Sequence, residues 1–369
     1  MKVMWLFPVN RRCGISIYSH DYINELNNKC EVITEDLSAI VNGKEPFLKG
    51  ADKVDLVHVQ YETSFFLKGR KDIYFKILSK LKVPVIVTLH EVYDEFPQIY
   101  PRSKIRGHGS VLAVKQIIYD IKHPVQTAFR KHCNKGFGAD LILLHHRFHK
   151  EILLKKGIKP ERVEILELPV KRSASKVNWK AGKQLILGST GFINPGYDYD
   201  LLFSALEKTE IDWKFIWIGG LRDDEHAEIL QDLRARIVDR KWQNRFIITG
   251  WVSEENQNEM LEKIDIYLSL FRYKSTSATF SRAVGALKPV IATEIPMTKE
   301  LNAYFNNGKS GPVMTVDNTP ESVALAIRKI LDDSRYRTEL LEAVELYSET
   351  LNITNMADRL ITIYRRLCR

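Results

Sequence analysis

Small hydroxyl residues and two cations follow an apolar run in the second half of the chain. The run ends at Leu270, and Arg272 and Lys274 follow it, where each could bind a diphosphate from the strand end or remain a solvated surface cation. Apolar positions at helical spacing begin again at Phe280. A loop that feeds a helix start offers unpaired N–H groups and the positive end of the helix dipole, which suits a phosphate. The small loop residues expected to face it are Ser275, Thr276, Ser277 and Ala278, although such clusters are also ordinary cap material.

Other residues with useful chemistry come at the ends of other apolar runs. Arg222 follows a Gly219-Gly220 turn, and a guanidinium there can bind a phosphate in a bidentate manner or remain a solvated surface cation. In the first half, His90 and Glu91 follow an apolar run, and Glu62 follows another. The two carboxylates are candidates for orienting an acceptor hydroxyl, and His90 is equally open to a purely structural role.

Both halves of the chain alternate short apolar runs with helical patterns. Near-continuous apolar strands separated by helices indicate parallel sheets covered on both faces, whose ligands bind at the carboxyl ends of the strands. The expected strands are 3–7, 31–34, 56–59, 85–89, 141–144 and 163–166, then 185–188, 215–218, 246–249, 266–270 and 290–292; the expected helices are 16–26, 65–81, 199–207, 227–238, 257–263, 320–332 and 355–367.

The length of 369 residues and a polar, aperiodic stretch near the middle indicate two domains. We expect an N-terminal domain at 1–170, a linker at 171–184, a second domain at 185–352 and a C-terminal helix at 353–369. The four cysteines have no paired spacing, which argues against a disulfide framework and favours a reducing cytoplasm.

The net charge of +9 is concentrated in one segment. Residues 97–160 hold 13 Lys and Arg but only three acidic residues. Apolar side chains such as Val114 and Ile118 are interleaved with Lys115 and Lys122 in this segment, as in a helix that lies on an anionic bilayer. The alternative is a solvated helical face. No nucleic-acid-binding module is present, so we expect no nucleic-acid partner.

Two further motifs do not support the chemistry they suggest. Gly308-Lys309-Ser310 has the ending of a phosphate-binding P-loop, but Ala303 stands where its first glycine is required. His146 and His149 lack a third ligand at a defined spacing, so we expect no metal site.

The order of short motifs resembles that of GT-B glycosyltransferases, in particular the retaining glycosyltransferase family 4. The matching segments are Gly188-Ser-Thr-Gly-Phe-Ile-Asn-Pro, Trp217-Ile-Gly-Gly, Ile248-Thr-Gly-Trp-Val, Asp265-Ile-Tyr-Leu-Ser, Lys288-Pro-Val-Ile-Ala-Thr, Glu300 followed by Asn307-Gly-Lys-Ser-Gly, and in the first half Gly14, Asp55-Leu-Val-His-Val-Gln-Tyr-Glu, Thr88-Leu-His-Glu and Ala139-Asp-Leu-Ile-Leu. The resemblance covers nearly the whole chain. It implies an α/β fold of two Rossmann-like, doubly wound parallel-sheet domains facing a cleft, with the C-terminal helix crossing back to the first domain.

The resemblance also implies roles for particular residues. The loop at Gly191 would approach the donor diphosphate, and the loop at Gly14 would approach the donor phosphate or the acceptor. His90 would contact the donor sugar or assist the acceptor. Arg11 and Arg12 lie just before Gly14 and could add positive charge on the acceptor side, or they could equally be solvated surface cations.

The chain departs from the family pattern at its charged donor-site residues. An Arg and a Lys of the loop after the first donor-domain strand are replaced by Phe192 and Tyr197, and two glutamates are replaced by Lys274 and Arg282.

The resulting hypothesis is a metal-independent glycosyltransferase, without a cofactor, that moves a sugar from a nucleotide-sugar donor to a hydroxyl of a glycan or lipid-linked acceptor, with retention. We expect it in the cytoplasm, at the inner face of the membrane if residues 97–160 bind lipid. The alternatives are a catalytically degenerate GT-B protein that acts as a scaffold or regulatory partner, and an isomerase or epimerase on the same two-domain plan.

Overall fold

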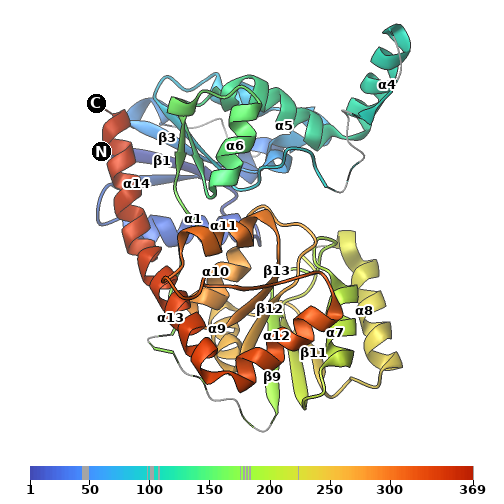
Figure 1. Ribbon diagram of the computed structural model, residues 1–369. Helices are drawn as coiled ribbons and strands as arrows, with labels where there is room; N and C mark the ends of the chain where they lie inside the picture. The colour runs from blue at the N-terminus through green and yellow to red at the C-terminus, as the bar shows by residue number, and fades with distance from the viewer. Residues whose placement is uncertain are drawn as a thin grey trace. The chain divides into compact units, whose positions relative to one another are not determined.

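The computed structural model describes residues 1–369 except 44–49, 98, 100–103, 107–108, 175, 178, 180–181, 183, 223 and 369. The chain divides into two compact units, Met1–Glu167 with Ile353–Arg369, and Leu168–Asn352 (Figure 1). The first unit ends at Glu167, slightly before the expected boundary at 170. In the described part of the expected linker, the N–H groups of Ser173 and Ala174 donate to the carbonyl of Gly285, so this part is attached to the second unit.

The first unit is built on a six-stranded parallel sheet. Its strand order is β2-β1-β3-β6-β7-β8. Side chains on both faces of the central strands are buried, as the continuous apolar runs predicted. The strands are β1 (Lys2–Phe7), β2 (Glu31–Asp36), β3 (Leu56–Tyr61), β6 (Val85–Leu89), β7 (Leu141–Leu144) and β8 (Val163–Ile165), and the helices are α1 (Gly14–Leu26), α2 (Leu37–Asn42), α3 (Tyr74–Leu78), α4 (Gly109–Lys122), α5 (Pro124–Asn134), α6 (Arg147–Lys155) and α14 (Ile353–Leu367).

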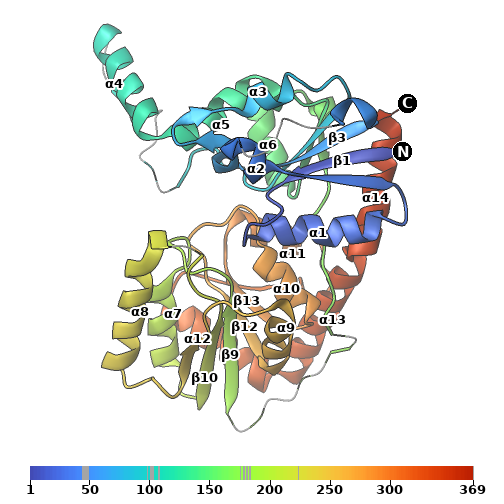
Figure 2. The ribbon, with the colours of Figure 1, turned by 180° about the vertical axis from the view of Figure 1, so that it is seen from behind.

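The helix α14 is part of the first unit and packs beside α1 (Figure 2). Its amphipathic pattern has a direct structural use, because Met356, Leu360 and Tyr364 are buried. The hydroxyl of Tyr364 accepts a hydrogen bond from Trp5 Nε1 at 2.9 Å and lies in hydrogen-bond contact with His58 Nδ1 at 2.6 Å, which attaches α14 to β1 and β3.

The helix expected over 65–81 is wrong. The segment forms a short 3₁₀ helix (Thr63–Phe66), a small antiparallel hairpin of β4 (Leu67–Lys68) and β5 (Lys71–Asp72), and then α3. Gly69 has a φ of +61° in the hairpin turn, a conformation that interrupts a helix. The apolar spacing in this segment reflects burial of side chains from separate elements.

The second unit repeats the parallel architecture, with strand order β11-β10-β9-β12-β13-β14. All five strands expected here are present, and β14 is an addition that the sequence analysis missed. The strands are β9 (Leu185–Thr190), β10 (Trp213–Ile218), β11 (Phe246–Ile248), β12 (Ile266–Ser269), β13 (Val290–Thr293) and β14 (Met314–Val316), and the helices are α7 (Tyr199–Lys208), α8 (Ala227–Asp239), α9 (Glu254–Lys263), α10 (Ala278–Gly285), α11 (Pro296–Tyr304), α12 (Pro320–Asp332) and α13 (Ser334–Thr350).

Candidate functional site

The strand order of the second unit reverses between β9 and β12. From β9 the chain continues to β10 and β11 on one side, and it then returns to β12 and β13 on the other. Open parallel sheets bind ligands at the carboxyl ends of the strands beside such a reversal. The loops after β9 and β12, which contain Gly191 and residues 270–278, meet this description.

The turns after β9 and β10 are packed against each other through glycines. Gly219 has a φ of +138°, and a Cβ on it would lie 2.2 Å from the carbonyl oxygen of Gly191. Gly191 has a φ of +111°; its N–H donates to the carbonyl of Ile218, and its own carbonyl accepts from Trp217 Nε1 at 3.0 Å. Both positions require glycine, because a side chain would force the two turns apart.

The Gly191 turn also lies against the start of α10. A Cβ on Gly191 would be 2.7 Å from Cγ2 of Thr279, in the first turn of this helix. Ser277 is the N-cap, and its hydroxyl accepts from the N–H of Phe280 at 3.2 Å. Ser275 is buried and Ala278 is the first helical residue. The hydroxyl of Thr276 is buried and has no hydrogen-bond partner among the described residues. An anion at this edge would meet backbone N–H groups, a hydroxyl and the positive end of the helix dipole.

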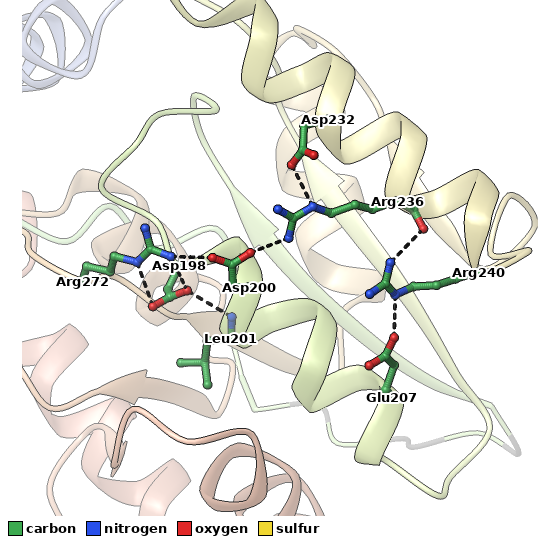
Figure 3. A network of polar contacts seen from close by, with 8 residues as sticks. All are labelled: Asp198, Asp200, Leu201, Glu207, Asp232, Arg236, Arg240 and Arg272. Atoms are coloured by element: carbon green, nitrogen blue, oxygen red, sulfur yellow. Dashed lines mark hydrogen bonds and ion pairs between the residues drawn. The ribbon is translucent and has the colours of Figure 1, made fainter.

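Arg272 is held by two carboxylates (Figure 3). Its Nε and Nη2 donate to the two oxygens of Asp198 at 2.9 and 3.0 Å, and Nη2 also lies 2.9 Å from Asp200. Burial by itself would raise the pKa of Asp198, but the hydrogen bonds from Arg272 and the N–H of Leu201 lower it below its usual range. The same side chain caps α7, so the guanidinium joins the loop after β12 to the start of this helix.

The network continues from α7 to α8. Arg236 contacts Asp200 at 2.5 Å and Asp232 at 2.7 Å, and Arg240 contacts Glu207 at 2.6 Å (Figure 3). Arg272 is therefore one end of a chain of ion pairs. Its role as a phosphate ligand stays a prediction, and a phosphate would compete with two carboxylates for its charge.

The other two candidate cations contact aromatic rings. The ammonium of Lys274 lies 5.2 Å from the ring of Phe271. The guanidinium of Arg222 lies 5.8 Å from the ring of Phe192, which itself stacks on Trp251. Phe192 is the position where the family resemblance implied a cation, and Arg222 brings positive charge to the Gly191 loop from a different strand end.

In the first unit the strand order reverses between β1 and β3, and the predicted acceptor-side residues follow these two strands. Arg11 and Arg12 are exposed in the loop before Gly14, the first residue of α1, and the guanidinium of Arg11 lies 4.8 Å from the ring of Phe65. Glu62 caps the 3₁₀ helix at Thr63–Phe66 by accepting from the N–H of Ser64 at 3.0 Å.

Glu62 lies in the electrostatic field of a second carboxylate at this edge. Burial raises the pKa of Glu62, and the negative charge of Glu91 raises it further. Glu91 is exposed directly after the strand end at His90. A carboxylate with a raised pKa can accept a proton near neutral pH more readily than an ordinary one, which suits a base toward a hydroxyl acceptor.

His90 is buried in a chain of hydrogen bonds. Its Nε2 lies 2.9 Å from Gln60 Oε1, its Nδ1 lies 3.2 Å from His145 Nε2, and His145 Nδ1 lies 3.0 Å from the carbonyl oxygen of Leu166. Burial lowers the pKa of His90 well below its usual range, and it lowers the pKa of His145 to about 3. Both rings are therefore neutral at physiological pH.

Neutral rings fix the direction of this chain. The carbonyl of Leu166 only accepts, so His145 carries its proton on Nδ1 and accepts on Nε2 from His90 Nδ1–H. His90 Nε2 must then accept a hydrogen bond, which the amide of Gln60 supplies if it is rotated by half a turn. The rotation also gives a partner to Gln60 Nε2, which is otherwise buried without one. Both ring nitrogens of His90 are then engaged, so a role in proton transfer would require Gln60 or His145 to be displaced.

The sequence analysis missed Gln60 and His145 as partners of His90. The available signal was the strand-end rule, because His145 follows β7 as His90 follows β6, and the preceding residues Leu89 and Leu144 are paired in the sheet. Gly219 and Thr279 were missed as well, since their importance lies in contacts with Gly191 that no spacing reveals. Among the described residues, no group of three or more His, Cys, Asp or Glu side chains is arranged to hold a metal ion.

Comparison with known proteins agrees with this geometry. Residues 186–333 match the family described as glycosyl transferases group 1. The alpha-D-kanosaminyltransferase of Streptomyces kanamyceticus is 26% identical over 293 residues, which cover 73% of this chain and 73% of that protein.

Solved structures extend the likeness over the whole chain. Anabaena HepE in complex with UDP-glucose has a TM-score of 0.73 at 13% identity, covering 99% of this chain and 100% of that one. Sucrose-phosphate synthase from Thermosynechococcus elongatus has a TM-score of 0.69 at 13% identity, covering 100% and 99%. The chain thus has the GT-B fold, and its residues 186–333 match the model of the glycosyl transferases group 1 family.

Proposed function

We propose that the protein transfers a sugar from a nucleotide-sugar donor to a hydroxyl of a glycan or lipid-linked saccharide, with retention of configuration. One observation carries the proposal: the Gly191 turn lies against the start of α10, beside a Thr276 hydroxyl that has no partner among the described residues. This arrangement at the β9/β12 reversal suits the diphosphate of the donor. It would stabilise the charge that develops on the leaving nucleotide diphosphate as the bond to the sugar breaks.

The donor class is supported by two similarities and one side chain. HepE was solved with UDP-glucose, and the relative from Streptomyces kanamyceticus is named alpha-D-kanosaminyltransferase. Arg222 supplies a guanidinium over Phe192, on the loop that relatives use for a cation. We expect no metal requirement, because N–H groups and Arg222 take the charge-stabilising role. Activity unchanged by a chelator would support this expectation.

The acceptor would be handled by the carboxyl edge of the first unit. Glu62 and Glu91 form a carboxylate pair in which one pKa is raised, and Arg11 and Arg12 add positive charge nearby. These groups suit the orientation of a hydroxyl on a saccharide that carries anionic groups. His90, with both ring nitrogens engaged, would act as a positioning residue at this edge rather than transfer a proton.

A second candidate function is a catalytically degenerate GT-B protein that serves as a scaffold or regulatory partner. The observation in its favour is that two residues at the substituted donor-site positions form hydrogen bonds within the protein. Tyr197 is buried with its hydroxyl 2.9 Å from Ser189, and Arg282 donates to Gln257, so neither supplies a group to a nucleotide.

Calorimetric titration of the protein with UDP, GDP and ADP separates the two functions. We expect one nucleotide to bind, and we expect Arg222→Leu to weaken it at least about tenfold, which corresponds to ~1.4 kcal/mol. Arg234→Leu is the matched control, since Arg234 is an exposed cation on α8. Failure of all three nucleotides to bind at about millimolar concentration would exclude the transferase and favour the scaffold.

Turnover tests the chemistry itself. The protein would be incubated with the sugar conjugate of the nucleotide that binds, with and without a saccharide acceptor, and the anomeric proton of the product would be examined by NMR. We expect a product only with acceptor and with the configuration of the donor retained. Conversion of the nucleotide sugar without acceptor would indicate an isomerase or epimerase instead.

A further inference from the structure

Helix α4 exposes an apolar face that no other described part of the chain covers. Five large aliphatic side chains on this one helix are about half exposed, between 47% and 57%. They make up five of the eleven large apolar residues that are exposed in the described chain. They are Val111, Val114, Ile117, Ile118 and Ile121. A contiguous apolar patch on a helix marks a contact surface, whereas single exposed apolar residues do not.

The opposite side of α4 is fixed to the protein. Tyr119 is buried, and its hydroxyl donates to Gln126 of α5. Asp120 pairs with Arg130 of α5 at 2.9 Å. These contacts fix the orientation of α4 about its own axis. The aliphatic face therefore points away from α5. In both ribbon views α4 projects beyond the other helices of the first unit (Figures 1 and 2).

The spacing of the exposed residues places lysines along the border of this face. Val114 and Ile118 are one turn apart, as are Ile117 and Ile121, so they form a continuous stripe. Lys115 lies one turn after Val111, and Lys122 lies one turn after Ile118; both lysines are exposed. Long lysine side chains at the border of an apolar face can reach upward to anionic headgroups while the aliphatic groups enter the acyl region.

The charge around this face favours an anionic membrane over a second copy of the protein as its binding partner. The segment 97–160 carries 13 basic and three acidic residues, and two of the acidic ones are used internally: Asp120 pairs with Arg130, and Asp140 accepts from the N–H of Val85. Two copies of α4 packed face to face would bring Lys115 and Lys122 of both chains together without neutralising them. An anionic surface would attract the same lysines.

We propose that α4 is an interfacial anchor that lies in the headgroup region of an anionic phospholipid bilayer, with the stripe of Val114, Ile117, Ile118 and Ile121 facing the acyl chains. The mode of attachment is peripheral, and among the described residues no helix is both long and apolar enough to cross a membrane. Residues of the basic segment outside α4 contact the rest of the first unit. Phe129 is buried, and Lys131 pairs with Asp72, so the lipid contact expected from residues 97–160 narrows to α4. Residues 98, 100–103 and 107–108 of that segment lie outside the described residues.

Flotation of the full-length protein with vesicles tests the anchor. Vesicles of phosphatidylcholine mixed with phosphatidylglycerol are compared with vesicles of phosphatidylcholine alone. We expect flotation with the anionic vesicles, and we expect Val114→Gln/Ile118→Gln to lower it at least about tenfold. The matched control is Val238→Gln/Leu325→Gln, which removes two apolar side chains that are at least as exposed, at 56% and 66%, from α8 and α12. Circular dichroism and nucleotide titration establish that the variants are folded, and nucleotide binding should be unchanged because α4 is remote in sequence from the donor loops.

Three outcomes would overturn the proposal. The first is wild-type protein that stays in the dense fraction with anionic vesicles at low salt. The second is a Val114→Gln/Ile118→Gln variant that floats as well as the wild type. The third is a wild-type dimer, measured by light scattering without lipid, that the same substitutions convert to a monomer, since the face would then be an interface between copies. None of these outcomes bears on nucleotide binding, so the transferase proposal is tested separately.

Discussion

Replacing Arg272 by Gln separates a structural role of this residue from a role in phosphate binding. The substitution removes the guanidinium that neutralises Asp198, whose side chain is only 7% exposed. Loss of one partner from a fully buried ion pair costs about 3–5 kcal/mol, whereas exposed pairs contribute about 0–1 kcal/mol. Arg272 is 46% exposed, and Asp198 keeps its hydrogen bond from the N–H of Leu201. We therefore expect Arg272→Gln to lower the free energy of unfolding by an intermediate amount, about 1–3 kcal/mol.

Urea unfolding of four proteins measures this effect: the wild type, Arg272→Gln, Asp198→Asn and the double variant. The structure predicts a coupling energy of about 1–2 kcal/mol, because the two single substitutions disrupt one interaction. Arg236→Gln is the matched control in the same network. Its partners Asp200 and Asp232 are 64% and 53% exposed, so we expect a loss below about 1 kcal/mol.

Nucleotide titration of the same proteins tests the alternative, in which Arg272 binds a phosphate of the nucleotide. If Arg272 acts through the loop, Arg272→Gln weakens nucleotide binding less than Arg222→Leu does. The reasoning would be refuted by an Arg272→Gln protein that unfolds at the wild-type urea concentration yet no longer binds the nucleotide. That result would make Arg272 a phosphate ligand, as the sequence analysis predicted.

Further predictions concern the buried hydrogen bonds of the first unit. Tyr364→Phe should destabilise the protein by about 2–5 kcal/mol in urea unfolding, because it leaves Trp5 Nε1 and His58 Nδ1 buried without a partner. Tyr22→Phe should cost less than about 1 kcal/mol, since its hydroxyl has no partner of ordinary distance and angle among the described residues; equal losses would contradict the assignment.

The pKa of His58 and of His145 is about 3, while an unfolded histidine titrates near about 6.5. Below the latter value the unfolded chain binds protons that the folded chain does not, so stability falls as the pH falls from about 6.5 toward 3. His145→Gln should reduce that slope by about one proton, ~1.4 kcal/mol per pH unit between about pH 6 and pH 4, and an unchanged slope would mean that His145 is charged in the folded state. Nitrogen-15 NMR should find the proton of His145 on Nδ1 at neutral pH, and a proton on Nε2 would reverse the proposed hydrogen-bond chain.

Periodicity and strand-end reasoning predicted the sheets well. The parallel strands of both units were expected because their apolar runs are short, β-branched and separated by helical patterns, and β6 and β7 have the expected bounds. β14 was missed because Thr315 interrupts its apolar run, next to the Gly311-Pro312 stretch. The helix over 65–81 was predicted wrongly for a different reason. Its apolar residues have helical spacing, but they belong to a 3₁₀ helix, a hairpin and α3, each of which buries its own apolar residues.

For the candidate site, too, some features could be predicted from the sequence and others could not. Topology places the ends of parallel strands at one edge of a sheet, so a residue that directly follows a strand can be assigned to that edge from its position alone. The partner of its side chain cannot be assigned so easily. Arg272 was expected to face a phosphate, but the carboxylates that hold it lie 74 and 72 positions earlier in the chain, at the start of α7.

The missing cation at Phe192 illustrates the same limit in reverse. A position-by-position comparison registers a lost charge, whereas three-dimensional packing brings Arg222 over the Phe192 ring from the turn after β10. The electrostatic potential at a donor phosphate is the sum over all charges at this edge of the sheet. A charged residue that follows any neighbouring strand can therefore contribute to it. We therefore expect the Gly191 loop to remain cationic, although Phe192 stands where the family resemblance implied a charged residue. The comparison of Arg222→Leu with Arg272→Gln decides which of the two guanidinium groups contributes to that field.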